Sequence, residues 1–148
     1  MGMRRKGREL AVQALYQMEI RDELSPEITL AAFWEQCEAG PRAREFGLQL
    51  IDGVRKEREQ IDAVIEKTSD NWKLDRLSTV DLSVLRVACY ELMFSREVPM
   101  NVVLDEAIEV ARRFGTTESA VFVNGVLDRI ATDLGVKPAP TEEAEKNG

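Results

Sequence analysis

The sequence contains no histidine and only two cysteines, and this scarcity narrows the chemistry open to the chain. Histidine is the commonest general base and the commonest metal ligand in proteins, so its absence argues against both kinds of site. The two cysteines, Cys37 and Cys89, share no short spacing and belong to no metal-binding motif. We therefore expect a reduced, cytoplasmic protein without structural zinc or any other cofactor.

Signatures of common enzyme classes are missing as well. The chain has no Walker A motif, no GxGxxG and no GxSxG. A pair of carboxylates could still perform acid–base chemistry, and such an enzyme would need a deep pocket holding two acids with raised pKa values. No acidic pair stands in the strand-end or loop context that usually presents one, so we predict that the protein is not an enzyme.

Long apolar runs are also absent. The basic start MGMRRKGREL lacks the apolar region of a signal peptide, and the most apolar stretch, residues 78–94, is too short and too polar to span a bilayer. A length of 148 residues with 44% hydrophobic and 32% charged residues is typical of one soluble domain. We expect a helical domain over residues 1–135 and a disordered polar tail over 136–148.

The most informative stretch is residues 78–94, STVDLSVLRVACYELMF, which is apolar nearly all the way round a helical wheel. Only Ser83, Arg86 and Tyr90 form a narrow polar strip. A helix of this kind is buried among other helices, so the predicted fold class is an all-α bundle around a central helix. Ser78 and Asp81, three residues apart, are typical of a helix start.

Glu91 falls inside the apolar arc of this central helix. A buried carboxylate needs a hydrogen-bond donor, so we expect one on another helix. The backbone N–H groups of residues 102–104 are our prediction, because a helix N-terminus favours an anion.

The remaining helices follow from apolar periodicity and from breakers in the sequence. We expect them over residues 4–20, 27–38, 41–68, 102–114 and 118–134, with a short helical turn over 72–77. Ser25 and Asn101 are the expected N-caps of the second helix and of the helix at 102–114. Glu109 and Arg113 stand four residues apart on one helix and are expected to pair.

Positive charge is concentrated at the start of the chain. Arg4, Arg5, Lys6 and Arg8 lie among the first eight residues with no acid between them, although the whole chain carries −7. Cations are unfavourable at a helix N-terminus, by roughly 0.3–1 kcal/mol each when exposed. Two interpretations stay open from charge alone: a solvated basic end, or an arm whose cations are relieved by an opposing phosphate.

Phe122 lies at the edge of the apolar stripe of the last helix, and Gly125 leaves bare backbone beside it. An aromatic ring in such a place can stack on an unpaired base. It can equally cover the rim of the core, and the pattern alone does not separate the two.

Four segments stand out together: LRVACYEL at 85–92, VPMNVVLDEAIEVARRFG at 98–115, FVNGVLD at 122–128 and, at the start, RRKGRELAVQALYQME at 4–19. In combination they resemble the NusB family of transcription antitermination factors. Order and spacing are kept over about residues 4–131. The same fold also occurs fused to ribosomal RNA methyltransferases, and since no residues remain here for a catalytic domain, the free-standing factor is the expectation.

The resemblance implies an all-α bundle of about seven helices in two subdomains. It also implies binding of the boxA element of ribosomal RNA leaders together with NusE, a ribosomal protein. With other Nus factors this pair assembles on RNA polymerase and suppresses premature termination. Whether the free protein is a monomer or a homodimer stays open. The alternatives are a helical protein–protein adaptor that does not bind RNA, and a related RNA-binding module serving ribosomal RNA processing.

The resemblance also assigns residues. The RNA-binding set that it implies is Arg4, Arg5, Lys6, Arg8, Lys73, Arg76, Glu118 and Phe122, and the acids that would face a NusE-type partner are Asp75 and Asp81. The chain departs from the family pattern at Gly7, which predicts that the first helix begins one turn late. It departs again at Ala120 and Val121, where some relatives have polar or basic residues, which predicts weaker RNA contact there.

Overall fold

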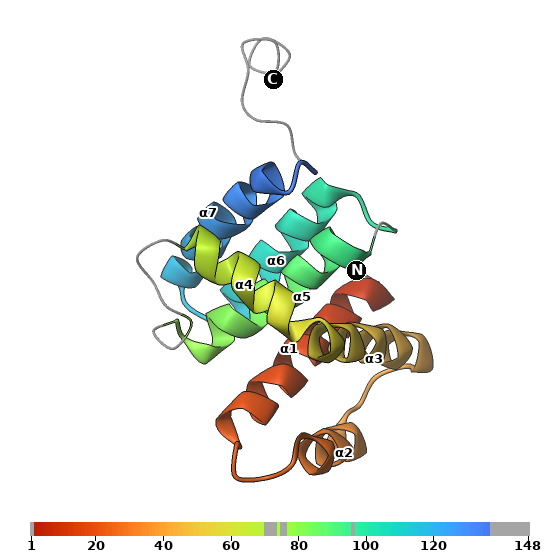
Figure 1. The fold of residues 1–148 in the computed structure, drawn as a ribbon. Helices are drawn as coiled ribbons and strands as arrows, with labels where there is room; N and C mark the ends of the chain where they lie inside the picture. Colours follow the sequence, from red (N-terminus) through yellow and green to blue (C-terminus); the bar gives the residue numbers. More distant parts are fainter. Residues whose placement is uncertain (1, 70–73, 75–76, 96, 137–148) are drawn as a thin grey trace, which may run out of the picture.

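We analysed a computed structural model of the chain, which describes residues 2–69, 74, 77–95 and 97–136. These residues form seven α-helices and no β-strand (Figure 1), which confirms the predicted all-α fold. The helices are α1 (Met3–Ile20), α2 (Pro26–Gln36), α3 (Pro41–Lys56), α4 (Arg58–Thr68), α5 (Thr79–Phe94), α6 (Met100–Phe114) and α7 (Thr117–Asp133). Helices α1 to α3 gather on one side and α4, α6 and α7 on the other, with α5 between them.

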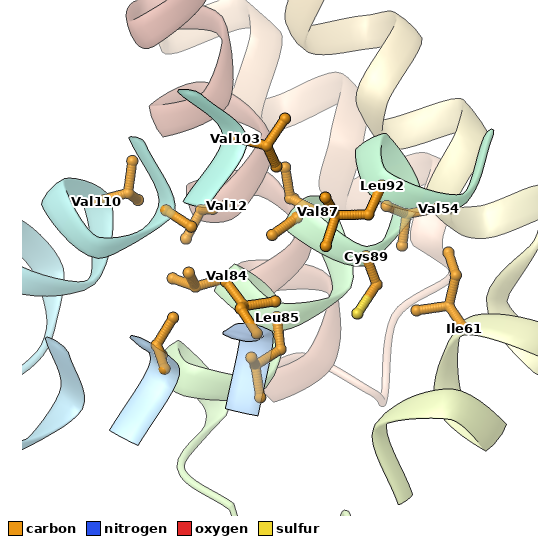
Figure 2. Packing of buried hydrophobic residues seen from close by; sticks show 14 of the residues in the cluster. Val12, Val54, Ile61, Val84, Leu85, Val87, Cys89, Leu92, Val103 and Val110 are labelled. Atoms are coloured by element: carbon orange, nitrogen blue, oxygen red, sulfur yellow. The ribbon is translucent and has the colours of Figure 1, made fainter. Parts of the chain in front are cut away.

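Helix α5 is the centre of the bundle, as the sequence predicted. It contacts α1, α3, α4, α6 and α7, and every residue from Leu82 to Cys89 is buried. Figure 2 shows its side chains packed among those of its neighbours, namely Val12 of α1, Val54 of α3, Ile61 of α4 and Val103 and Val110 of α6. The start is capped as expected, because the Ser78 hydroxyl accepts a hydrogen bond from the Asp81 N–H at 3.1 Å.

Two residues of the polar strip of α5, Ser83 and Arg86, are buried, and the third, Tyr90, is half-buried. Arg86 is 5% exposed and donates to Asp62 of α4 at 2.8 Å and to Glu19 of α1 at 3.0 Å. Arg58 contacts the same two acids. Arg86 is tolerated inside because a carboxylate from each of two helices satisfies its guanidinium.

The single helix predicted over residues 41–68 is two helices, so that expectation is wrong. The backbone leaves the helical conformation at Glu57, with φ −102° and ψ 17°. A straight helix of this length would be about 40 Å long and could not follow a compact core. The turn allows both Val54 of α3 and Ile61 of α4 to be buried against α5.

Gly7 does not delay the first helix, which begins at Met3 and runs unbroken through it. A Cβ atom at Gly7 would lie 2.7 Å from a ring carbon of Phe46 and 3.1 Å from the carbonyl oxygen of Ala43. A Cβ atom at Gly47 of α3 would likewise lie 3.1 Å from the carbonyl oxygen of Gly7. The glycines therefore let α1 and α3 pack backbone against backbone at this crossing.

Two of the predicted caps have different outcomes. Ser25 accepts from the Ile28 N–H at 3.3 Å, as expected. Asn101 does not cap α6, which begins one residue earlier, at Met100. Pro99 holds the extended backbone conformation that a cap requires, and its carbonyl oxygen accepts the first N–H bonds, so Asn101 falls inside the first turn.

The remaining sequence expectations concern the turn at 72–77, the tail at 136–148, the cysteines and membrane spans. Most of the turn, and the tail beyond residue 136, lie outside the described residues. Cys37 and Cys89 are free thiols, and complete burial raises the pKa of Cys89. Within the described residues, no helix has the length and apolar character to cross a membrane.

Candidate nucleic-acid interface

Arg8 of α1 and Glu91 of α5 form a buried ion pair. The Nε and Nη2 atoms of Arg8 each donate to a different Glu91 oxygen at 2.8 Å, and the two side chains are 4% and 2% exposed. The prediction that Glu91 needs a donor on another helix is confirmed, but the predicted donors at residues 102–104 are wrong. A guanidinium supplies two parallel bonds and a full positive charge, which two backbone amides do not.

Burial changes the role expected for Arg8. It was predicted to bind RNA, but a phosphate could reach it only by separating it from Glu91. Leaving a buried charge without its partner costs about 3–5 kcal/mol. Arg8 therefore belongs to the framework that holds α1 against α5, where its guanidinium also lies 5.4 Å from the centre of the Phe46 ring.

Arg5 lies at the surface and is held by Glu106 of α6. Its Nε donates to both Glu106 oxygens, at 3.0 and 3.2 Å, and Nη2 contacts one of them as well. This hydrogen bonding lowers the pKa of Glu106 and raises the pKa of Arg5. The Arg5 side chain is 35% exposed, so it faces solvent in a fixed position.

Arg4 and Lys6 are exposed on the first turns of α1. The Arg4 side chain is 46% exposed, lies 3.9 Å from Glu97 and sits over the Phe46 ring at 5.9 Å. The helix start has neither a side-chain cap nor an acid in its first turn. Free N–H groups and clustered cations together make this end attractive to an anion. Three of the four predicted basic residues thus share one surface, which we call the basic end: Arg4, Arg5 and Lys6.

The basic end lies against α6, which runs beside α1 in the same direction. The ion pairs between the two helices show this direction: Arg5 pairs with Glu106, and further along both helices Glu9 pairs with Arg113 at 3.4 Å. Between the helices lies a hollow of about 380 Å³, lined by Gly2, Arg5, Lys6, Glu9, Glu109 and Arg113. The predicted Glu109–Arg113 pair is wrong, because Glu109 pairs with Arg112 and Arg113 turns toward α1.

A second depression, which we call the groove, separates the start of α5 from the start of α7. Its volume is about 510 Å³, and its lining includes Asp81, Phe114, Glu118 and Phe122. Glu118 is exposed, and Phe122 is half-buried and packs against the core. The structure therefore brings two predicted RNA residues and one predicted partner residue into the same groove.

Asp81 has an unusual environment within the groove. Its Oδ1 atom is buried and has no hydrogen-bond partner among the described residues. Buried polar atoms are nearly always paired in folded proteins, so this acceptor is an exception that the described residues do not satisfy. The other predicted site residues near this edge, Lys73, Asp75 and Arg76, lie outside the described residues.

Gly125 lies one turn beyond Phe122 on α7 and is open to solvent. No atom lies within 4 Å of the position that a Cβ would take there. Val121, which precedes Phe122, is 71% exposed. The rim of α7 beside the groove is thus uncovered backbone and an apolar side chain, without a cation from position 120 or 121.

Comparisons with known proteins agree with this architecture. The sequence matches the NusB family over residues 5–132. It is 44% identical over 135 residues to the transcription antitermination protein NusB of Sorangium cellulosum, covering 91% of this chain and 96% of that protein. It is 47% identical to the NusB of Trichlorobacter lovleyi, covering 88% and 91%.

Solved structures give the same result. T. maritima NusB superimposes with a TM-score of 0.77 and 39% sequence identity, over 96% of both chains. A chain from the crystal structure of the antitermination factors NusB and NusE in complex with double-stranded RNA gives a TM-score of 0.80 at 27% identity, covering 90% of this chain and 98% of that one. Because the family match covers most of this chain and the relatives are more than 40% identical to it, the chain belongs to the NusB family.

Proposed function

We propose that this protein is a transcription antitermination factor that binds the boxA RNA of ribosomal RNA leaders together with a NusE-type ribosomal protein. In this role it would act in the cytoplasm, in a complex with other Nus factors on RNA polymerase. The observation that carries the proposal is the basic end: Arg4, Arg5 and Lys6 are gathered at the uncapped start of α1 in a chain of net charge −7. The solved relative that contains NusE and RNA supports the same class of partners.

The basic end would contact the RNA backbone, and the groove would contact bases. Each cation placed on a phosphate of single-stranded RNA releases about 0.7 condensed counterions, so three cations release about two. This is enough for weak, salt-sensitive affinity without sequence choice. Choice of sequence requires unpaired bases, for which Phe122 offers a ring for stacking and Glu118 an acceptor for base amino groups.

The partner would add the rest of the affinity. Ribosomal proteins are basic, so the acids assigned to the partner surface, Asp81 and Asp75, have the complementary charge. The position of Asp81 supports this assignment, since its side chain is among those that line the groove. The proposal therefore predicts that RNA binds weakly to the free protein and more tightly to its complex with NusE.

Fluorescence anisotropy of a labelled boxA RNA, titrated with and without purified NusE at two salt concentrations, tests the proposal. Tighter binding with NusE, weaker binding at high salt and failure of a scrambled RNA are the expected results. If the folded protein binds no RNA in either condition, the proposal is wrong and the alternative of a helical adaptor with a solvated basic end takes its place.

A further inference from the structure

We infer that Arg113, at the end of α6, is a further RNA-backbone contact and that it joins the basic end to the groove. The inference rests on the proposed function and deepens it, because it defines the path that one RNA strand takes over the surface. Arg113 is absent from the site residues that the sequence pattern and the family resemblance assign.

The position of Arg113 carries the argument. Its side chain lines the hollow between α1 and α6 together with Arg5 and Lys6 of the basic end. The next residue, Phe114, lines the groove together with Phe122 and Glu118. Consecutive residues at the end of α6 thus line the two depressions, so the path of a strand that contacts both runs by this end of the helix.

The chemistry of Arg113 fits a phosphate. Its side chain is 64% exposed, and its described polar contact is a single long one, from Nη1 to Glu9 at 3.4 Å. The guanidinium lies 5.5 Å from the centre of the Phe114 ring, which holds the plane at the surface. A guanidinium has five N–H donors in a planar fork, so Arg113 can bind a phosphate through two bonds while Glu9 keeps one.

The charge of the hollow favours an anion over a cation. Its lining has three cations, Arg5, Lys6 and Arg113, against two acids, Glu9 and Glu109. Each acid is already engaged, Glu9 by Arg113 and Glu109 by Arg112. An RNA phosphate in the hollow would therefore meet paired carboxylates and the positive charge of Lys6, for which the described residues supply no ion pair.

Arg112 provides a matched comparison on the same turn. Its side chain is 58% exposed, close to the value for Arg113, but it pairs with Glu109 of its own helix and lines neither the hollow nor the groove. Arg112→Ala and Arg113→Ala remove the same charge from neighbouring positions. Their long-range electrostatic effects are nearly equal, so a difference between them reports a local contact.

The experiment measures binding of boxA RNA to the full-length wild-type protein and to both variants, with NusE present, over a series of salt concentrations. We expect Arg113→Ala to weaken binding by roughly 5-fold and to lower the slope of log K against log salt by about 0.7. Arg112→Ala should weaken binding by less than about 2-fold. Arg113→Lys keeps the charge but not the fork, and should recover part of the loss.

A length series of RNAs tests whether Arg113 joins two sites. With an oligonucleotide too short to reach from the basic end to the groove, at most one of the two variants Arg113→Ala and Phe122→Ala should weaken binding. With longer RNA, both variants should reduce affinity. Thermal unfolding provides the folding control. Arg113 is exposed but its partner Glu9 is only 10% exposed, so Arg113→Lys, which keeps a cation for Glu9, shows whether a loss of affinity comes from lost stability.

Two failures are distinguishable. If the wild-type protein binds boxA RNA but Arg113→Ala and Arg112→Ala lose the same affinity and the same salt slope, Arg113 is not a contact and the proposed function stands. If the wild-type protein binds no RNA, the proposed function is wrong and this inference falls with it.

Discussion

The two ends of α1 are both tied to the bundle by arginine–carboxylate pairs, but the balance between cations and acids differs between these two clusters. At the C-terminal end, Glu19 and Asp62 meet Arg58 and Arg86, two acids for two cations. At the N-terminal end, buried Arg8 uses Glu91 and surface Arg5 uses Glu106. Arg4 and Lys6 are additional, and the ion pair that the described residues give Arg4 is a long one, to Glu97 at 3.9 Å.

This difference separates two uses of the same chemistry. A balanced cluster around the buried Arg86 fixes the packing of α1, α4 and α5 and leaves little net charge to attract an outside ion. An unbalanced cluster at a helix start leaves positive charge and free N–H groups facing solvent. Among the four basic residues near the start of α1, depth divides the roles again, because buried Arg8 holds the helix in place while Arg4, Arg5 and Lys6 of the basic end face outward.

The largest expected effect comes from breaking the buried pair at the N-terminal end. Arg8→Ala leaves Glu91 buried without a partner and should lower the free energy of unfolding by about 3–5 kcal/mol. Arg86→Ala, at the other end, should be milder, by roughly 1–3 kcal/mol, because Glu19 and Asp62 are nearer to solvent and can recover water. Urea denaturation followed by circular dichroism measures both.

A hydrophobic replacement sharpens this result. In the double variant Arg8→Met with Glu91→Leu, both charges are absent, so stability should return close to that of the wild-type protein. If Arg8→Ala instead unfolds like the wild type and loses RNA affinity, Arg8 is a surface contact and its assignment to the framework is wrong.

An intermediate effect is expected on RNA binding. Arg4→Ala with Arg5→Ala should weaken boxA binding by roughly 10-fold, and should lower the salt slope by about 1.4. The melting temperature should change little, since both side chains are substantially exposed. Anisotropy at several salt concentrations, together with thermal unfolding, separates the two readouts.

The chain offers a close control at the opposite end of α1. Arg55 and Arg58 are 34% and 49% exposed, against 35% for Arg5 and 46% for Arg4. Arg55→Ala with Arg58→Ala removes equal charge from a balanced region and should leave RNA affinity nearly unchanged. Equal losses in the two double variants would mean that net charge alone governs binding, and that the basic end is not a site.

The sequence alone predicted the features that depend on local periodicity. The central helix, its Ser78 cap and the burial of Cys89 and Glu91 all follow from which residues stand three, four and seven apart. The break at Glu57 did not follow, because neither glycine nor proline marks it and packing on α5 causes it. The need of Glu91 for a donor was visible, but the donor, Arg8, is 83 residues away in the chain.

One available signal separated the basic residues from each other. Arg8 stands three and seven residues before Ala11 and Leu15, both of which are buried, so it continues the apolar face of α1. A cation on one buried face and an acid on another are expected to meet, since neither is stable alone. Arg113 had no comparable signal, because its basic neighbours in the hollow, Arg5 and Lys6, come from α1.

The smallest expected effect is on pH dependence and concerns Glu106. Hydrogen bonds from Arg5 lower the pKa of Glu106 below its ordinary value of 4.5, so ionised Glu106 stabilises the folded state above that value. This stabilisation is lost as the pH falls through the lowered pKa. Arg55 lowers the pKa of Glu27 in the same direction, but Glu27 is exposed to solvent, which screens the pair.

Glu106→Gln should therefore flatten the fall in melting temperature between pH 5 and pH 3, whereas Glu27→Gln should leave the wild-type curve nearly unchanged. Melting curves of the three proteins over this range measure the difference. The same Glu106→Gln protein should bind RNA more tightly at neutral pH, because Arg5 then meets a phosphate without a competing carboxylate. If the melting temperature of Glu106→Gln falls less at acid pH but its RNA affinity is unchanged, Arg5 belongs to the framework with Arg8. The basic end would then consist of Arg4 and Lys6 alone.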